Sequence, residues 1–180
     1  MANFNSVDEA VNFFIRAFDN HAYESMNNPD ARNSFAQRGI YCAYSDAVFY
    51  NNKGIMLAGK GGNGKSEMAD RFVQQGAIYL SQDFTWMLVE NGRPFIINTL
   101  NQEPKRSSID FLFWIEAGGM RGFNDFELGY LIDLMFDRHP EDIKMGMPQI
   151  LSRVAAYKYN TGEEGPKETF DSLRGIIDSN

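Results

Sequence analysis

Eight residues from Gly59 to Ser66 have the types and spacing of a loop that binds phosphate groups. They read Gly-Lys-Gly-Gly-Asn-Gly-Lys-Ser and fit the pattern G-x-x-x-x-G-K-[ST] at every required position. In such a loop the glycines let successive backbone N–H groups turn toward phosphate oxygens, the lysine supplies a positive charge, and the serine hydroxyl can bind Mg²⁺. The pattern therefore predicts that the chain binds a nucleoside triphosphate, with ATP and Mg²⁺ as its cofactors.

The segments on either side of this loop are those that a phosphate-binding loop requires. The apolar run 55–58 before it is a candidate buried strand, and residues 67–73 after it read as a helix that stops at Gly76. A helix beginning at the loop adds its N-terminal partial positive charge to the site. The residues expected to contact the nucleotide are Gly59, Lys60, Gly61, Gly62, Asn63, Gly64, Lys65, Ser66 and Glu67. The pattern leaves open whether the base is adenine or guanine.

The rest of the chain predicts a single mixed α/β domain over residues 1–180. Residues 1–38 are expected to hold an amphipathic first helix over 7–18 and an irregular polar segment, and residues 39–180 the core. Strands are expected at 41–50, 55–58, 77–80, 84–89, 95–99, 109–115 and 154–159, and further helices at 124–135, 148–153 and 166–177. Residues 51–54 and 91–92 predict hairpin turns, 118–122 a glycine-bearing turn, and 104–108 a solvated connection.

Composition excludes several classes of function. The chain has 180 residues and a hydrophobic fraction of 43%, which indicates a folded globular protein. Its net charge of −7 argues against nucleic acid or an anionic membrane as the main binding partner. One cysteine excludes an internal disulfide, and two histidines with one cysteine do not assemble a zinc site. The N-terminus has no apolar signal-peptide region, so the cytoplasm is the expected location.

A second pattern follows the loop and suggests a family. Residues 66–83 read Ser66-Glu67-x-Ala69-x-x-Phe72-Val73-x-x-Gly76-x-x-Leu80-x-x-Asp83, which resembles the core of the HPr serine kinase/phosphorylase family. That family shares its fold with ATP-dependent phosphoenolpyruvate carboxykinase. The resemblance implies an α/β fold with a phosphate-binding loop and a mixed sheet flanked by helices. It also implies a kinase that transfers the γ-phosphate of ATP to a hydroxyl group, with a serine of a protein or peptide as the acceptor.

The resemblance carries over residue by residue, with three departures. Asp83 stands where the second of two family acids falls, and is expected to hold Mg²⁺ with Ser66 and to take the proton of the attacking hydroxyl. This expectation assumes that the strand ending near Asp83 lies beside the strand that leads into the loop. Gln82 replaces the first acid, Tyr44 or its neighbour stands where the family has a histidine, and the family's Arg-Gly signature has only a loose counterpart around Arg121. Lys65, Asp83, Tyr44 and Arg121 are therefore the candidate catalytic residues.

Two other readings remain open at this point. The run from Lys60 to Ser66 also fits the deviant loop K-G-G-x-G-K-[ST] of the ParA, MinD and ArsA ATPases, in which the first lysine reaches across a nucleotide-bound dimer. Alternatively, Gln82 and the missing histidine could mark a nucleotide-binding or assembly module that has lost its chemistry. The identity of the acceptor and the oligomeric state, a homo-oligomer included, are not fixed by the sequence.

Overall fold

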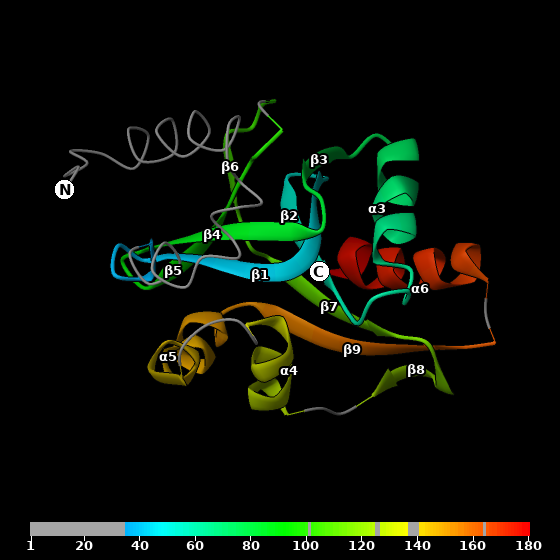
Figure 1. The fold of residues 1–180 in the computed structure, drawn as a ribbon. Helices are drawn as coiled ribbons and strands as arrows, with labels where there is room; N and C mark the ends of the chain where they lie inside the picture. The colour runs from blue at the N-terminus through cyan, green and yellow to red at the C-terminus, as the bar shows by residue number, and fades with distance from the viewer. Residues whose placement is uncertain (1–34, 101, 125–126, 137–140, 164) are drawn as a thin grey trace.

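A computed structural model of the chain describes residues 35–100, 102–124, 127–136, 141–163 and 165–180 (Figure 1). The predicted first helix over 7–18 and most of the irregular segment 19–38 lie outside these residues. The described part contains nine strands: β1 (Ile40–Tyr50), β2 (Lys53–Ala58), β3 (Ile78–Ser81), β4 (Phe84–Glu90), β5 (Arg93–Ile97), β6 (Arg106–Ser108), β7 (Phe111–Glu116), β8 (Gly118–Asn124) and β9 (Ala155–Gly162). Its helices are α3 (Lys65–Gln74), α4 (Leu128–Met135), α5 (Glu141–Leu151) and α6 (Pro166–Ser179).

The strands form one mixed sheet in the order β6-β5-β4-β1-β2-β7-β9-β8, with β3 pairing on β1. At its centre β2, β7 and β9 run parallel, with Ile55 opposite Phe111 and Phe111 opposite Ala155. The C-terminal ends of parallel strands lie at one edge of a sheet, and ligands of α/β proteins bind outside that edge. The loop that follows β2 therefore emerges at the edge where β7 and β9 also end.

Helices cover both faces of this sheet, as Figure 1 shows. On one face α3 and α6 pack together, and the Phe72 ring contacts Phe170 with ring centroids 4.8 Å apart. On the other face α4 and α5 contribute Leu131 and Met147 to a second apolar core. The expected mixed sheet flanked by helices is confirmed.

Both hairpins predicted from turn residues are present. Asn51 and Asn52 connect β1 to β2 with φ angles of 49° and 62°, and Asn91 and Gly92 connect β4 to β5 with φ angles of 52° and 71°. Two consecutive residues with positive φ form the turn that matches the twist of antiparallel strands, and asparagine and glycine adopt it at low cost.

The position of β3 corrects one expectation. β3 pairs with β1 and not with β2, so β1 lies between β3 and the strand that leads into the loop. The local sequence specifies that a strand forms, whereas its neighbours depend on long-range pairing. Because β1 is antiparallel to both, β3 still runs parallel to β2, and residues 81–83 end at the same edge as the loop.

Other element boundaries also differ from the sequence-based expectation. The glycine-bearing segment 118–122 belongs to strand β8, which pairs with β9, and the polar stretch 104–108 contributes strand β6. Helix α4 begins at Leu128 with Glu127 as its N-cap, so Asn124 does not cap it. Helix α5 begins at Glu141 and contains Pro148, where the sequence predicted a start. Pairing with a neighbouring strand explains the first two differences, since it satisfies backbone groups that glycine-rich or polar segments leave free in a loop.

Candidate functional site

The loop 59–64 joins β2 to α3 and is tied closely to the end of β7. Gly59 has a φ of 154°, and a Cβ atom built on it would lie 2.4 Å from the carbonyl oxygen of Ile115. The Asn63 side chain donates a hydrogen bond of 3.1 Å to that same oxygen. The loop is thus fastened to the neighbouring parallel strand through one carbonyl group, and only glycine fits where the two backbones approach.

Helix α3 begins directly from this loop. Gly64 is its N-cap in the left-handed conformation, with φ 83° and ψ 15°, and its carbonyl accepts the first helical hydrogen bond from Met68 N at 2.9 Å. The first N–H groups of an α-helix have no acceptor within the helix, and the helix dipole places partial positive charge there. The N–H groups around Lys65 and Ser66 can therefore bind an anion held in the loop.

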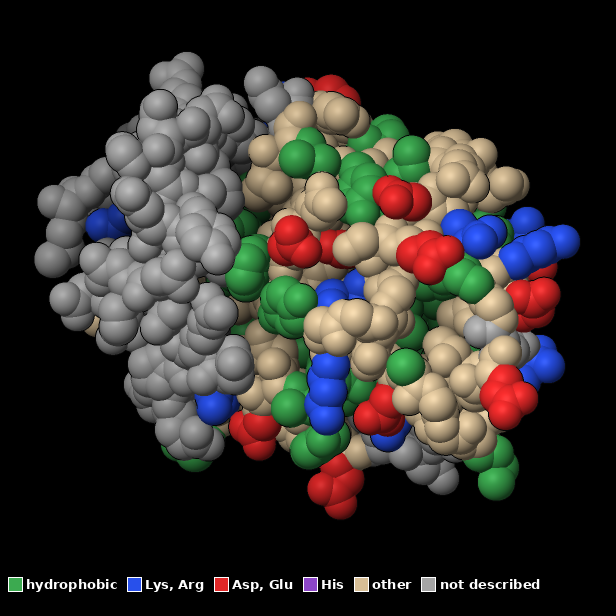
Figure 2. Space-filling model, turned by 45° about the vertical axis from the view of Figure 1, so that its right-hand side comes forward, with side chains coloured by type: hydrophobic (Ala, Val, Ile, Leu, Met, Phe, Trp, Pro, Cys, Tyr) green, Lys and Arg blue, Asp and Glu red, His purple; other side chains and the backbone are tan. Residues whose placement is uncertain are grey.

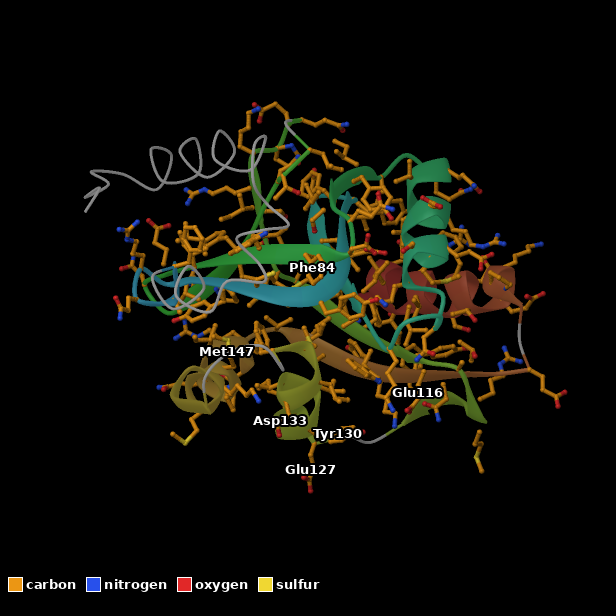
Figure 3. The ribbon with its side chains drawn as sticks, in the orientation of Figure 1. Phe84, Glu116, Glu127, Tyr130, Asp133 and Met147 are labelled. Atoms are coloured by element: carbon orange, nitrogen blue, oxygen red, sulfur yellow. The ribbon has the colours of Figure 1, made fainter. Side chains whose placement is uncertain are left out.

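Lys65 is buried, and its ammonium group lies between the loop and β1. Its Nζ donates to the Lys60 carbonyl at 3.2 Å and lies 4.2 Å from the centroid of the Tyr44 ring. The Tyr44 hydroxyl would be 3.8 Å from a Cβ atom on Gly61, so Tyr44 borders the loop. The ring also packs against Phe84 at the start of β4, labelled in Figure 3, with centroids 5.6 Å apart. The structure thus brings Tyr44 and Lys65 together, and Phe84 packs against the Tyr44 ring.

Asp46 on β1 is a residue that the sequence analysis did not single out. Its side chain is fully buried, and its Oδ1 accepts a 2.5 Å hydrogen bond from the backbone N–H of Asp83. Burial raises the pKa of the Asp46 carboxyl above its ordinary value. Hydrogen bonding by the Ser66 side chain and the Asp83 N–H lowers that pKa, the Asp83 charge raises it and the Lys65 charge lowers it. Asp46 therefore connects the candidate residues Ser66, Asp83 and Lys65.

Asp83 itself is held in an uncommon backbone conformation. Its φ is 62°, a left-handed value that aspartate tolerates better than most residues, and its side chain is exposed. The bond to Asp46 fixes the Asp83 backbone at the end of β3. Asp83 is therefore linked to the loop region through Asp46 on β1, because β3 does not pair directly with β2.

The residues at this edge fit a nucleotide with a hard cation. Ser66 and the two carboxylates Asp46 and Asp83 offer only oxygen ligands, which Mg²⁺ prefers, and the nucleotide's phosphates and water would complete its six ligands. Within the described residues no group of three or more His, Cys, Asp or Glu side chains could hold a metal ion. A cation at this site would thus need ligands beyond the protein's carboxylates, as a nucleotide-bound Mg²⁺ has.

Glu116 is a second acid that the sequence analysis overlooked. It ends β7, directly after Ile115, and its Oε2 lies 2.6 Å from Nζ of Lys158 on β9 (Figure 3). The signal that could have found it is an acid directly after an apolar run that forms a parallel strand beside the loop strand. Because Lys158 already pairs with it, Glu116 is a charged neighbour of the loop whose carboxylate is partly neutralised.

The other predicted site residues are exposed and lie around the loop or away from it. Lys60 and Glu67 are exposed, and Glu67 forms a helical ion pair with Arg71 at 3.7 Å. Gln82 is exposed beside Asp83. Arg121 is exposed on β8, with β7 and β9 between its strand and β2. The structure does not bring Arg121 to the loop through strand pairing, and its role as a phosphate contact stays a prediction.

The surface near α3 and α6 mixes charges of both signs with apolar groups. Figure 2 turns this side forward, and no single sign of charge covers the described part of the face in view. Positive charge beside the loop is therefore supplied by individual side chains such as Lys65 and by the N-terminal end of α3. In the described part of the chain, no helix combines the length and apolar character needed to cross a membrane.

Comparisons with known proteins find similarity among solved structures but not among sequences. No family model matches the chain, and no curated protein matches its sequence. Among solved structures, the HPr(Ser) kinase/phosphatase from Coxiella burnetii is similar, with 8% sequence identity and a TM-score of 0.47. The similarity covers 77% of this chain and 91% of that one.

Proposed function

We propose that the protein is a phosphotransferase that binds Mg²⁺·ATP at residues 59–66 and transfers the γ-phosphate to a hydroxyl group. A serine of a protein or peptide is the proposed acceptor. The sequence pattern and its family resemblance imply this activity, and the fold brings Asp46 and Asp83 to the loop as well.

The observation that carries the proposal is the meeting of three chain segments at one edge of the sheet. The loop supplies Lys65 and Ser66, β1 supplies Asp46, and the end of β3 supplies Asp83. A buried lysine, a hydroxyl and two carboxylates are the groups that phosphoryl transfer uses, because its transition state is stabilised by positioned charges more than by covalent chemistry. A glycine-rich turn without a ligand would not need a buried ammonium beside buried and exposed acids.

Each residue has a defined part in this proposal. Lys65 holds the negative charge of the transferring phosphoryl group, and the Tyr44 ring keeps its ammonium at the loop. Ser66 and Asp83 hold the cation, which supplies charge neutralisation when bound. Asp83, with its carboxylate exposed to solvent, accepts the proton of the acceptor hydroxyl. Solvent exposure of Asp83 is what an acceptor that arrives from outside requires.

A second candidate is an ATPase of the deviant-loop class, and the exposure of Lys60 favours it. An exposed lysine at this position is free to reach the nucleotide of a second subunit. The two candidates differ in the response to Lys60→Ala. The substitution should abolish ATP hydrolysis in a sandwich dimer and leave a kinase mostly active.

Binding of a fluorescent ATP analogue tests the proposal before any acceptor is known. The wild type should bind it in the presence of Mg²⁺, and Lys65→Ala should weaken binding at least tenfold because a buried charge–phosphate contact is lost. Lys167→Ala is the matched control, since it removes an exposed lysine from α6. Equal affinity of the wild type and Lys65→Ala would contradict the assignment of the loop.

A further inference from the structure

We infer that Asp46 is a ligand of a divalent cation, held together with Ser66 and Asp83 at the start of α3. Neither the loop pattern nor the family resemblance assigns a role to this residue. The inference extends the proposed function, because this cation is the one that would accompany the nucleotide.

The burial of Asp46 is the first argument. Its relative accessibility is 0%, and its Oδ2 has no hydrogen-bond partner among the described residues. An unpartnered buried carboxylate oxygen is costly, and buried polar atoms in folded proteins are almost always satisfied by a partner, water or an ion. Asp46 lies opposite Leu57 in the β1–β2 pairing, on a strand where an apolar residue would pack at no such cost.

The surroundings of Asp46 point toward a cation. Oδ1 is already used by the backbone N–H of Asp83, and the Ser66 side chain is near enough to hydrogen-bond to the carboxylate. The Asp83 carboxylate is near enough that its charge raises the pKa of Asp46. Two like charges beside a hydroxyl repel one another in the free protein, and a divalent cation between them removes this repulsion.

Lys65 offers an alternative explanation for the buried Asp46 carboxylate, and the experiment below must distinguish it from cation binding. Its positive charge also reaches Asp46, and Asp46 could serve only as a counter-charge for the buried ammonium. However, Lys65 Nζ is committed to the Lys60 carbonyl and the Tyr44 ring, and its hydrogen bonds do not include Oδ2 of Asp46. The free oxygen therefore remains available to a cation.

This assignment also accounts for Gln82. The family resemblance places two neighbouring acids at 82–83, and an amide replaces the first of them. An amide oxygen carries no charge and is a weaker ligand for Mg²⁺ than a carboxylate. Asp46, reaching Asp83 from β1, restores the pair of negative charges from a different strand.

Titration with Mn²⁺ alone tests the inference, because Mn²⁺ takes the same oxygen ligands as Mg²⁺ and its free form is measured directly by electron paramagnetic resonance. The wild type should bind one Mn²⁺ with a dissociation constant of roughly 0.1–1 mM, the range of weak oxygen sites. Asp46→Asn should bind it at least tenfold more weakly, and Ser66→Ala should also weaken binding. Asparagine keeps the size of the side chain and an oxygen that can accept from Asp83, so the fold should be preserved, which circular dichroism checks.

Asp70→Asn is the matched control, since Asp70 is an exposed acid on α3 whose charge, like that of Asp46, raises the pKa of Tyr79 after the larger effect of burial. It should change Mn²⁺ affinity less than twofold. Equal Mn²⁺ affinity of the wild type and Asp46→Asn, or no Mn²⁺ site in the wild type, would overturn the inference and leave Asp46 as the partner of Lys65. Binding of ATP in the presence of Mg²⁺ is measured in parallel: its absence, with Mn²⁺ binding intact, would instead overturn the proposed function.

Discussion

Substituting Gly59 by alanine should damage the loop far more than the same change at Gly62. A Cβ atom at Gly59 would lie 2.4 Å from the Ile115 carbonyl oxygen, whereas an ordinary contact is about 3.4 Å or more. The loop or the end of β7 must therefore move by about 1 Å. Overpacking of this kind costs about 1–3 kcal/mol, and the positive φ of 154° adds about 1–2 kcal/mol for a residue with a side chain. The expected loss of unfolding free energy is roughly 2–5 kcal/mol.

Gly62→Ala is the matched control because Gly62 also has a positive φ, 81°, but a Cβ there would have no atom within 4 Å. Its cost should be only the backbone term of about 1–2 kcal/mol. Urea unfolding followed by circular dichroism measures both values, and binding of a fluorescent ATP analogue measures the effect on the site. Gly59→Ala should also weaken nucleotide binding at least tenfold, since the Ile115 carbonyl that must shift also holds Asn63. Equal stability and affinity of the two variants would refute this account of the loop.

Three further predictions concern the core, the lysine and the buried acid. Phe72→Ala should lower the unfolding free energy by about 3–5 kcal/mol in urea titrations, because the ring is fully buried between α3, β1 and α6; a loss below about 1 kcal/mol would contradict this packing. Tyr44→Leu should weaken ATP-analogue binding about twofold to fivefold by removing a cation–π contact of about 0.5–1 kcal/mol, whereas Tyr44→Phe should bind as the wild type does. Asp46 has a pKa raised above 3.8, so the folded protein retains a proton that the unfolded chain releases, and stability falls as pH rises from 3.8 through the folded pKa. As pH rises through this range, Asp46→Asn should therefore become more stable relative to the wild type in metal-free thermal unfolding. A difference in stability between the two proteins that does not change with pH would contradict the direction of the pKa shift.

Local sequence signals predicted the elements that depend on nearby residues. The turn residues Asn51, Asn52, Asn91 and Gly92 specify their conformation directly, and both hairpins are present. The change from an apolar run to a glycine-rich loop and then to helical spacing likewise predicted β2 and α3. In each case the information lies within a few residues, where backbone preferences decide the structure.

Strand neighbours could not be predicted in the same way. The position of β1 between β2 and β3 depends on long-range pairing along this 11-residue strand. Its second half pairs antiparallel with β2 on one side and with β3 on the other, and its first half pairs antiparallel with β4. The glycines of β8 predicted a turn because each tolerates positive φ, yet pairing with β9 makes the segment a strand. Long-range hydrogen bonds outweighed the local preferences here.

The candidate site likewise contains one residue that the sequence indicates and one that only the folded structure reveals. The family resemblance puts Tyr44 or its neighbour at a histidine position, and the structure places the Tyr44 ring 4.2 Å from the Lys65 ammonium. Asp46 was passed over because one acid in an apolar strand segment has no periodic or motif signal. Its importance becomes visible only through burial, the unpartnered oxygen and the bond from Asp83, all of which are properties of the folded chain.

Transfer of label from γ-labelled ATP to a protein measures phosphotransferase activity itself. The wild type, Lys65→Ala and Asp83→Asn are each incubated with Mg²⁺ and labelled ATP, alone and with cell lysate. We expect label on a protein band with the wild type and with neither variant. Tight binding of ATP by the wild type with neither transfer nor hydrolysis would contradict the phosphotransferase assignment and leave a nucleotide-binding module.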